Sequence, residues 1–208
     1  MSGSSFEHRF VPGTLPSTLL LLHGTGADEN DLLPLGKALA PEANHLSPRG
    51  KVLENGMPRF FRRMAPGVFD VEDLIARAGE LAAFVSEAVS AYELDASRVW
   101  AVGFSNGANI GAALLLLHPQ LLRGAVLLRA QIPLEPEAAP RLDGKTVLVC
   151  AGRHDEMVPG AETDRLAKLL ESAGAEVEVR WSEGGHGLMH DEVAVAREWL
   201  AGRLDQQG

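Results

Sequence analysis

A serine enclosed by glycines is the residue of this chain best suited to do chemistry. The segment reads Gly103-Phe104-Ser105-Asn106-Gly107. The apolar run Val99–Val102 leads into it and the small residues from Ala108 lead out, which is the strand–turn–helix arrangement of a nucleophile elbow. There a strained turn projects the hydroxyl above the sheet edge, and the glycines allow the chain to approach itself closely. We therefore predict that Ser105 is a nucleophile, against the simpler interpretation of a glycine-containing turn.

A serine hydroxyl is a weak nucleophile unless a base activates it, and the base needs an acid to orient it. On a parallel sheet with such an elbow, the acid and then the histidine follow the serine along the chain. Asp155 comes in a loop directly after the apolar run Val147–Ala151, where such sheets place their ligand sites. His186 lies in the glycine-rich segment Gly184–Gly187. We predict Asp155 as the acid and His186 as the base.

Three other residues compete for these two roles. Glu156 adjoins Asp155, and Asp143 precedes the strand and so falls at the wrong edge of the sheet. His190 falls in the last predicted helix, four residues after His186. This spacing also suits a zinc-binding helix, but the glutamate of such a helix is missing and no other ligand cluster stands nearby. The residues therefore predict no metal site.

Acyl transfer also needs donors for the oxyanion, which usually supply the largest electrostatic contribution. One donor is predicted to be the backbone N–H of Asn106, the residue after the nucleophile. The other is predicted in the loop His23-Gly24-Thr25-Gly26, with the Thr25 N–H as the choice. A phosphate-binding loop is the competing interpretation, but no Gly-Lys-Ser/Thr follows. His23 is interpreted as a packing and hydrogen-bonding residue, and Cys150 as a core thiol.

Elements that position these residues can be recognised from their hydrophobic patterns. Short, nearly continuous apolar runs are typical of parallel strands covered on both faces. They occupy Leu19–Leu22, Val99–Val102, Ala125–Leu128 and Val147–Ala151, and Glu176–Trp181 and Phe6–Val11 resemble edge strands. Helical stripes fall on Leu74 to Tyr92, Leu166 to Ala173 and Val193 to Leu200. Strand alternating with helix predicts a mostly parallel, doubly wound α/β sheet in a single domain spanning residues 1–208.

Two connections interrupt this alternation. Ser47 to Asp70 is long and irregular, and it leaves a strand near His45 at the same sheet edge as Ser105. We predict that it walls a substrate pocket, with Arg59, Phe60 and Phe61 as substrate-binding residues; a surface loop pinned by its aromatic side chains is the alternative. The second connection, Ala130 to Lys145, is too short for a lid domain and predicts an open site.

Composition limits the classes of partner. The 208 residues carry a formal net charge of −9, which disfavours nucleic acid and anionic membrane surfaces. A single cysteine cannot form an intrachain disulfide, and Met1 to Phe10 lacks the basic and apolar regions of a secretory leader. Apolar runs are too short for a membrane span. We expect a cytoplasmic protein that acts on a small molecule.

Together these motifs resemble the phospholipase/carboxylesterase family of α/β-hydrolases, which includes acyl-protein thioesterases. The resemblance runs from Leu20-Leu21-Leu22-His23-Gly24 to Gly185-His186, and the bacterial carboxylesterase branch is the most similar. That branch is suggested by Arg49-Gly50, Glu54-Asn55-Gly56, Arg59-Phe60-Phe61 and Ser105-Asn106-Gly107-Ala108-Asn109. Thioesterases carry Ser-Gln-Gly-Gly at the elbow, so this chain departs from them. The resemblance implies an α/β-hydrolase fold, no cofactor and a possible homodimer.

These observations predict a serine carboxylesterase that hydrolyses small or short-chain carboxylic esters through an acyl-enzyme intermediate. An acyl-protein thioesterase or lysophospholipase is the second enzyme hypothesis, and it would need a long apolar channel. A ligand-binding module without catalysis on the same fold is the alternative from another class. Serine, aspartate and histidine in the required order argue against it, because a receptor has no use for all three.

Overall fold

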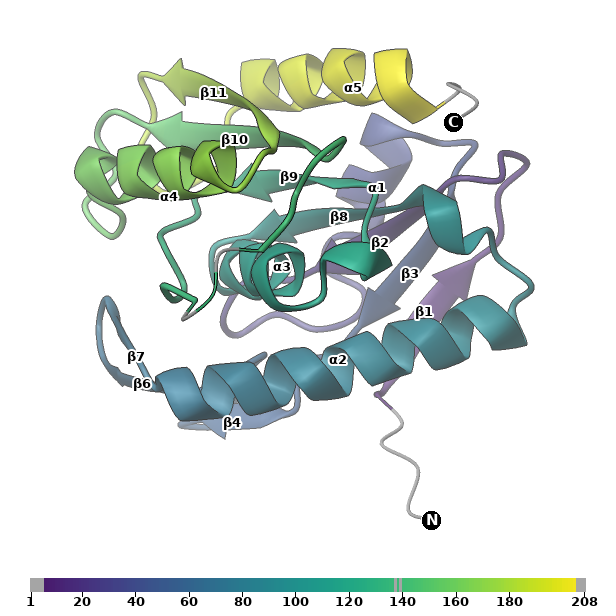
Figure 1. The fold of residues 1–208 in the computed structure, drawn as a ribbon, viewed down its shortest axis with the longest axis horizontal. Helices are drawn as coiled ribbons and strands as arrows, with labels where there is room; N and C mark the ends of the chain where they lie inside the picture. The colour runs from purple at the N-terminus through teal and green to yellow at the C-terminus, as the bar shows by residue number, and fades with distance from the viewer. Residues whose placement is uncertain (1–5, 137, 139, 205–208) are drawn as a thin grey trace.

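The computed structural model describes residues 6–136, 138 and 140–204, and a seven-stranded sheet runs through its centre (Figure 1). The strand order is β1-β3-β2-β8-β9-β10-β11, and only β1 runs antiparallel to its neighbour. The strands are β1 His8–Val11, β2 Thr18–Leu22, β3 Asn44–Pro48, β8 Val99–Phe104, β9 Gly124–Leu128, β10 Thr146–Gly152 and β11 Glu176–Ser182. This mostly parallel α/β sheet confirms the predicted fold class.

Helices cover both faces of the sheet (Figure 1). They are α1 Leu33–Leu39, α2 Val71–Ala91, α3 Asn106–Leu117, α4 Gly160–Ser172 and α5 His190–Leu204, with 3₁₀ turns at Ala96–Arg98 and Pro119–Leu121. One core cluster joins α2, α3 and α4 to the sheet, and a second joins α1 and α5 to the other face. The three predicted helical stripes are confirmed. The seven-residue α1 was not predicted, since Pro34 and Gly36 interrupt its pattern.

Local sequence explains the elements nearest to the site. Every residue of β2 and β9 is buried, as expected for strands covered on both faces. Helix α2 begins where the Asp70 side chain accepts a hydrogen bond from the backbone N–H of Asp73, a standard N-cap. Helix α3 is buried along almost its whole length, and its alanines and glycines let it lie close beneath the sheet. The elements around the sheet edge that carries Ser105 are therefore held by burial and by local hydrogen bonds.

The connection from Ser47 to Asp70 leaves β3 at the same edge as Ser105, as predicted, but it is not irregular. It forms two small antiparallel hairpins, β4 Val52–Glu54 with β5 Met57–Arg59 and β6 Arg63–Ala65 with β7 Val68–Phe69. Asn55 and Gly56, both at positive φ, form the first turn. An Asn-Gly pair is a strong hairpin signal, so the expectation of an irregular connection is wrong at this turn.

The second long connection, from Ala130 to Lys145, contains neither helix nor strand among its described residues, which exclude 137 and 139. It therefore builds no lid domain in the part that can be described. No helix among the described residues has the length and apolar character that a bilayer crossing requires. The expectation about a leader falls partly on residues 1–5, which lie outside the described residues.

Close packing at the elbow leaves no room for a side chain at Gly107. Ser105 adopts a positive φ of 53° between β8 and α3. A Cβ atom built on Gly107 would lie 1.9 Å from the carbonyl oxygen of Leu22, and one on Gly103 would lie 2.5 Å from the carbonyl oxygen of Gly107. Backbone atoms cannot yield as a flexible side chain can, so glycine is required where α3 passes under β2.

Replacing Gly107 by alanine should therefore lower the free energy of unfolding by about 3 kcal/mol or more, through backbone overlap in a packed core. Gly79 is the matched control, because it lies inside α2 and a methyl group added there would meet nothing within 4 Å. Gly79→Ala should raise the free energy of unfolding by about 0.5–1 kcal/mol, because alanine favours a helix. Urea unfolding measures both changes. Equal effects of the two substitutions would contradict the steric account.

Candidate active site

Ser105 stands at the carboxyl end of the central strand β8, and α3 begins at the next residue. Its backbone N–H donates to the carbonyl oxygen of Leu128 at 2.8 Å, which ties the elbow to the end of β9. The strained φ and this hydrogen bond fix the position of the serine, so its hydroxyl lines a cavity above the sheet.

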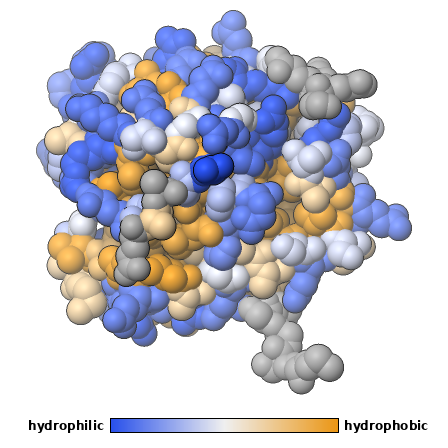
Figure 2. All heavy atoms as spheres, in the orientation of Figure 1, coloured by the Kyte–Doolittle hydropathy of each residue, from blue (hydrophilic) through white to orange (hydrophobic). Residues whose placement is uncertain are grey.

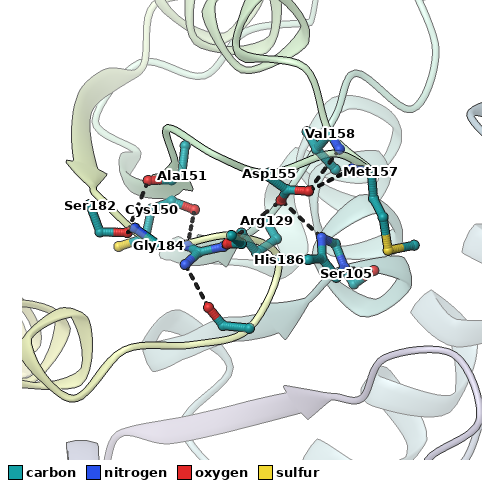
Figure 3. Close-up of polar contacts among 12 residues, drawn as sticks. Ser105, Arg129, Cys150, Ala151, Asp155, Met157, Val158, Ser182, Gly184 and His186 are labelled. Atoms are coloured by element: carbon teal, nitrogen blue, oxygen red, sulfur yellow. Dashed lines mark hydrogen bonds and ion pairs between the residues drawn. The ribbon is translucent and has the colours of Figure 1, made fainter.

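The structure brings Ser105, His186 and Asp155 into one hydrogen-bonded chain (Figure 3). His186 Nε2 lies 2.9 Å from Ser105 Oγ, and His186 Nδ1 lies 2.9 Å from Asp155 Oδ2. The three residues are far apart in the sequence and come from the loops that follow β8, β10 and β11. This is the geometry required of a nucleophile, a base and an orienting acid.

Asp155 is held by more than the histidine. Its Oδ1 accepts the backbone N–H groups of Met157 at 2.8 Å and Val158 at 3.0 Å, and its side chain is 1% exposed. Both carboxylate oxygens are thus occupied, which fixes the plane of the carboxylate. Glu156, the adjacent rival, is exposed at the cavity. Asp143 lies beside Gly174, near the start of β10 rather than its end.

The two histidines of the last loop are separated as predicted. His186 lies in the loop after β11, and its ring packs near Phe104 with 5.4 Å between the ring centroids. His190 is the first residue of α5 and lines a different surface groove, between α1 and α5. Among the described residues, its ring has no hydrogen bond to Ser105 or to Asp155. His186, at 2.9 Å from both Ser105 Oγ and Asp155 Oδ2, is therefore the histidine that the geometry brings to these two residues.

Both predicted oxyanion donors border the cavity beside Ser105. Thr25 and Asn106 line it together with Gly24. Within the part of the chain that the structure describes, neither backbone N–H is hydrogen-bonded to another group, so both can serve a substrate oxygen. The side chain of Asn106 has a role that was not predicted: its Oδ1 accepts the Phe60 backbone N–H at 2.7 Å, which ties the elbow to the hairpin segment.

His23 links the loop that follows β2 to the segment that follows β3. Its Nδ1 donates to the Gly24 carbonyl at 2.7 Å, and its Nε2 accepts the Gly50 N–H at 2.9 Å. These two roles need the neutral ring, and burial lowers the pKa of His23, which favours that form. His23 is thus a packing and hydrogen-bonding residue, as expected. Cys150 is also a core thiol: it is buried, and this burial raises its pKa to about 12.

The cavity above the triad has a volume of about 1050 Å³. Its walls come from the β6–β7 hairpin, the segment after Ala130, the loop after Asp155 and the start of α4. Figure 2 shows apolar surface at the end of the molecule that carries β6 and β7, and the cavity-lining residues Val68, Val71 and Met157 are exposed. The hairpin segment therefore does wall the site.

The individual residues predicted in that segment need correction. Phe60 and Phe61 do not line the cavity; they are 2% and 0% exposed and belong to the core under the hairpins. Arg59 borders the cavity, but its guanidinium is committed to Glu54 and, through Nε at 2.9 Å, to the Phe61 carbonyl. Phe60 and Phe61 were predicted to bind substrate, because the two hairpins that precede and follow them were not recognised in the sequence.

Arg129 was not predicted from the sequence at all. An arginine after a strand is usually exposed, but this one is 1% exposed and lies beside Asp155 and His186 (Figure 3). No sequence signal would have identified it without knowledge of the fold.

Within the described residues, no group of three histidine, cysteine or acidic side chains could hold a metal ion.

Comparisons with known proteins show similarity along nearly the whole chain. The model of the phospholipase/carboxylesterase family matches residues 14–203. The protein MhqD of Bacillus subtilis (strain 168), named as a hydrolase, is 45% identical over 193 residues, which cover 93% of this chain and 96% of that protein. The crystal structure of the Bacillus cereus carboxylesterase has a TM-score of 0.93 at 46% identity, covering 97% and 96% of the two chains.

A carboxylesterase from Mesorhizobium loti is similar as well, with a TM-score of 0.86, 36% identity, and coverage of 97% of this chain and 92% of that chain. These relatives share the α/β-hydrolase fold over nearly the whole described length, and they place the chain among hydrolases. On the family match and on these identities, the chain belongs to the phospholipase/carboxylesterase family of α/β-hydrolases.

Proposed function

We propose that this protein is a serine carboxylesterase that hydrolyses small or short-chain carboxylic esters through an acyl-enzyme intermediate. The observation that carries the proposal is the chain of two 2.9 Å hydrogen bonds from Ser105 through His186 to Asp155. Family membership supports a hydrolase, and the proposal adds the nucleophile and the course of the reaction. Residues 1–208 act in it as a single domain, since the sheet takes strands from both ends of the described chain.

In the proposed mechanism, Ser105 Oγ attacks the ester carbonyl carbon while His186 Nε2 takes its proton. The carbonyl oxygen becomes an oxyanion that accepts hydrogen bonds from the Thr25 and Asn106 N–H groups. His186 then returns the proton to the leaving alcohol, and the acyl group stays on Ser105. A water molecule, deprotonated by His186, attacks the acyl carbon; the bond to Ser105 Oγ then breaks, His186 returns the proton to Oγ, and the carboxylic acid leaves. Asp155 holds the imidazole ring in place and stabilises its charged form.

The shape of the cavity supports small substrates. The described part of the Ala130–Lys145 connection leaves the site uncovered, and the charged side chains of Arg63, Glu156 and Arg165 border the cavity together with apolar residues. A palmitoyl chain would need a continuous apolar channel, because contact with charged groups gains no hydrophobic free energy. This arrangement favours the esterase over the acyl-protein thioesterase or lysophospholipase alternative.

Ser105→Ala should lower kcat/KM for an activated ester by about 10⁴-fold or more, because the nucleophile is lost and only binding and the oxyanion donors remain. The melting temperature should change little, since the substitution removes one oxygen at the cavity. A fluorophosphonate probe should label the wild-type protein and leave this variant unlabelled. Labelling of another serine in the variant would refute the assignment.

His186→Ala should reduce activity as severely as Ser105→Ala, and the double variant should be no worse than either, because the members of a catalytic unit are not additive. His190→Ala is the matched control, at the start of α5, and it should keep most of the activity. Initial rates with one activated ester compare these four variants with the wild type. A greater loss with His190→Ala would show that the base has been misassigned.

Among p-nitrophenyl esters from acetyl to palmitoyl, kcat/KM should peak at acyl groups of about two to six carbons. Beyond that length, added methylenes leave the apolar part of the cavity and no longer strengthen transition-state binding. The readout is kcat/KM at substrate concentrations below micelle formation. An optimum at palmitoyl would instead support the thioesterase or lysophospholipase alternative.

A further inference from the structure

Arg129 occupies an unusual position at the centre of the sheet edge. It follows the last residue of β9, and its side chain is 0% exposed. Its backbone N–H donates to the Cys150 carbonyl at 2.9 Å, which ties the end of β9 to β10. Its φ is +59°, although it is neither glycine nor asparagine. A bulky residue in that conformation costs free energy, and such strain concentrates at functional sites.

The guanidinium of Arg129 binds both residues that flank the catalytic histidine. Its Nε donates to the Gly185 carbonyl and its Nη2 donates to the Gly187 carbonyl, each at 2.8 Å. The loop between these contacts is rich in glycine, so its backbone has many accessible conformations when nothing holds it. The two hydrogen bonds select one of them, in which the His186 ring lies between Ser105 and Asp155.

The positive charge of Arg129 is compensated from the other side. Glu192, near the start of α5, binds Nη1 at 2.5 Å and Nη2 at 2.7 Å in a bidentate pair, and it also accepts the Met189 N–H at 2.8 Å. Burial alone would raise the pKa of Glu192, but these hydrogen bonds hold it below the ordinary value. The pair therefore remains ionised, and it joins the histidine loop to α5.

Arg129 also reaches the acid of the triad. Its Nε lies 3.9 Å from Asp155 Oδ2, the same oxygen that faces His186 Nδ1 (Figure 3). One side chain thus contacts the loop of the base, lies beside the carboxylate of the acid, and extends from the strand whose last carbonyl binds the Ser105 N–H. Each of the three predicted catalytic residues is linked to Arg129 or to its strand.

We propose that Arg129, with Glu192 as its counter-ion, is a positioning residue that holds His186 in line between Ser105 and Asp155. The inference rests on the proposed function of the triad. Arg129 does not line the cavity and touches no reacting atom; it acts through the backbone of the histidine loop. Its loss should therefore lower kcat and leave KM nearly unchanged, because substrate binding uses other residues.

The test must separate positioning from stability, because deleting one member of a buried ion pair leaves the other charge unpaired and destabilises the fold. The double variant Arg129→Met with Glu192→Leu removes both charges and fills the space with apolar side chains, a change that is often neutral for stability. We expect its melting temperature to remain close to that of the wild type. We expect kcat to fall by about 100-fold, since a displacement of about 1 Å costs that much.

Arg123→Met is the matched control. Arg123 immediately precedes β9, as Arg129 immediately follows it, and it likewise donates to a loop carbonyl, that of Gly144, but at the opposite sheet edge. It should keep wild-type kcat. A second readout is the low-field proton resonance of the hydrogen bond between His186 Nδ1 and Asp155, which should persist in Arg123→Met and disappear from the double variant.

Arg129→Lys keeps the inference testable if the double variant does not fold. Lysine keeps the charge opposite Glu192 but cannot reproduce the planar donors that serve both loop carbonyls, so kcat should fall by about 10-fold with KM unchanged. A double variant or lysine variant that keeps kcat within about twofold of the wild type, with the low-field resonance in place, would overturn the inference. That result would leave the triad intact, because Ser105→Ala tests the triad separately.

Discussion

The site depends on the close passage of α3 beneath the ends of β2 and β8. Only a glycine at position 107 lets the helix pass under the Leu22 carbonyl, and Ser105 adopts a positive φ at the turn into this helix. The serine then stands above the sheet edge with the Asn106 N–H beside it. The parallel direction of β8, β10 and β11 brings the other two loops to the same edge. Sheet geometry thus determines where three distant side chains meet.

The histidine loop has the least support from the sheet itself. Glycines at 184, 185 and 187 give His186 the freedom to reach over Ser105, and the same freedom must be restricted if the ring is to stay aligned. The buried pair of Arg129 and Glu192 supplies that restriction. A buried ion pair contributes little to net stability, but it can specify one arrangement of the chain. In the proposed role, the pair of Arg129 and Glu192 specifies the conformation of the histidine loop.

Much of the fold followed from the sequence, because parallel strands covered on both faces are continuous apolar runs and the elbow has its own residue pattern. Asp155 and His186 could be chosen as partners of Ser105 because a fold with this elbow places the acid and then the histidine after the serine in the chain. Contacts between distant segments were not. Phe60 and Phe61 belong to the core between two hairpins whose pairing was not recognised, and the buried Arg129 is paired with Glu192, 63 residues later. Local patterns do not encode such pairs.

In the proposed reaction an acyl group passes through Ser105, and trapping this covalent intermediate tests that step. The protein is mixed with a slowly deacylated ester, quenched in acid and digested, and the peptides are analysed by mass spectrometry. The account predicts the acyl mass on the peptide that contains Ser105, disappearing at the rate of turnover. An adduct on another residue, or turnover at the steady rate with no burst of alcohol release and no adduct, would contradict it.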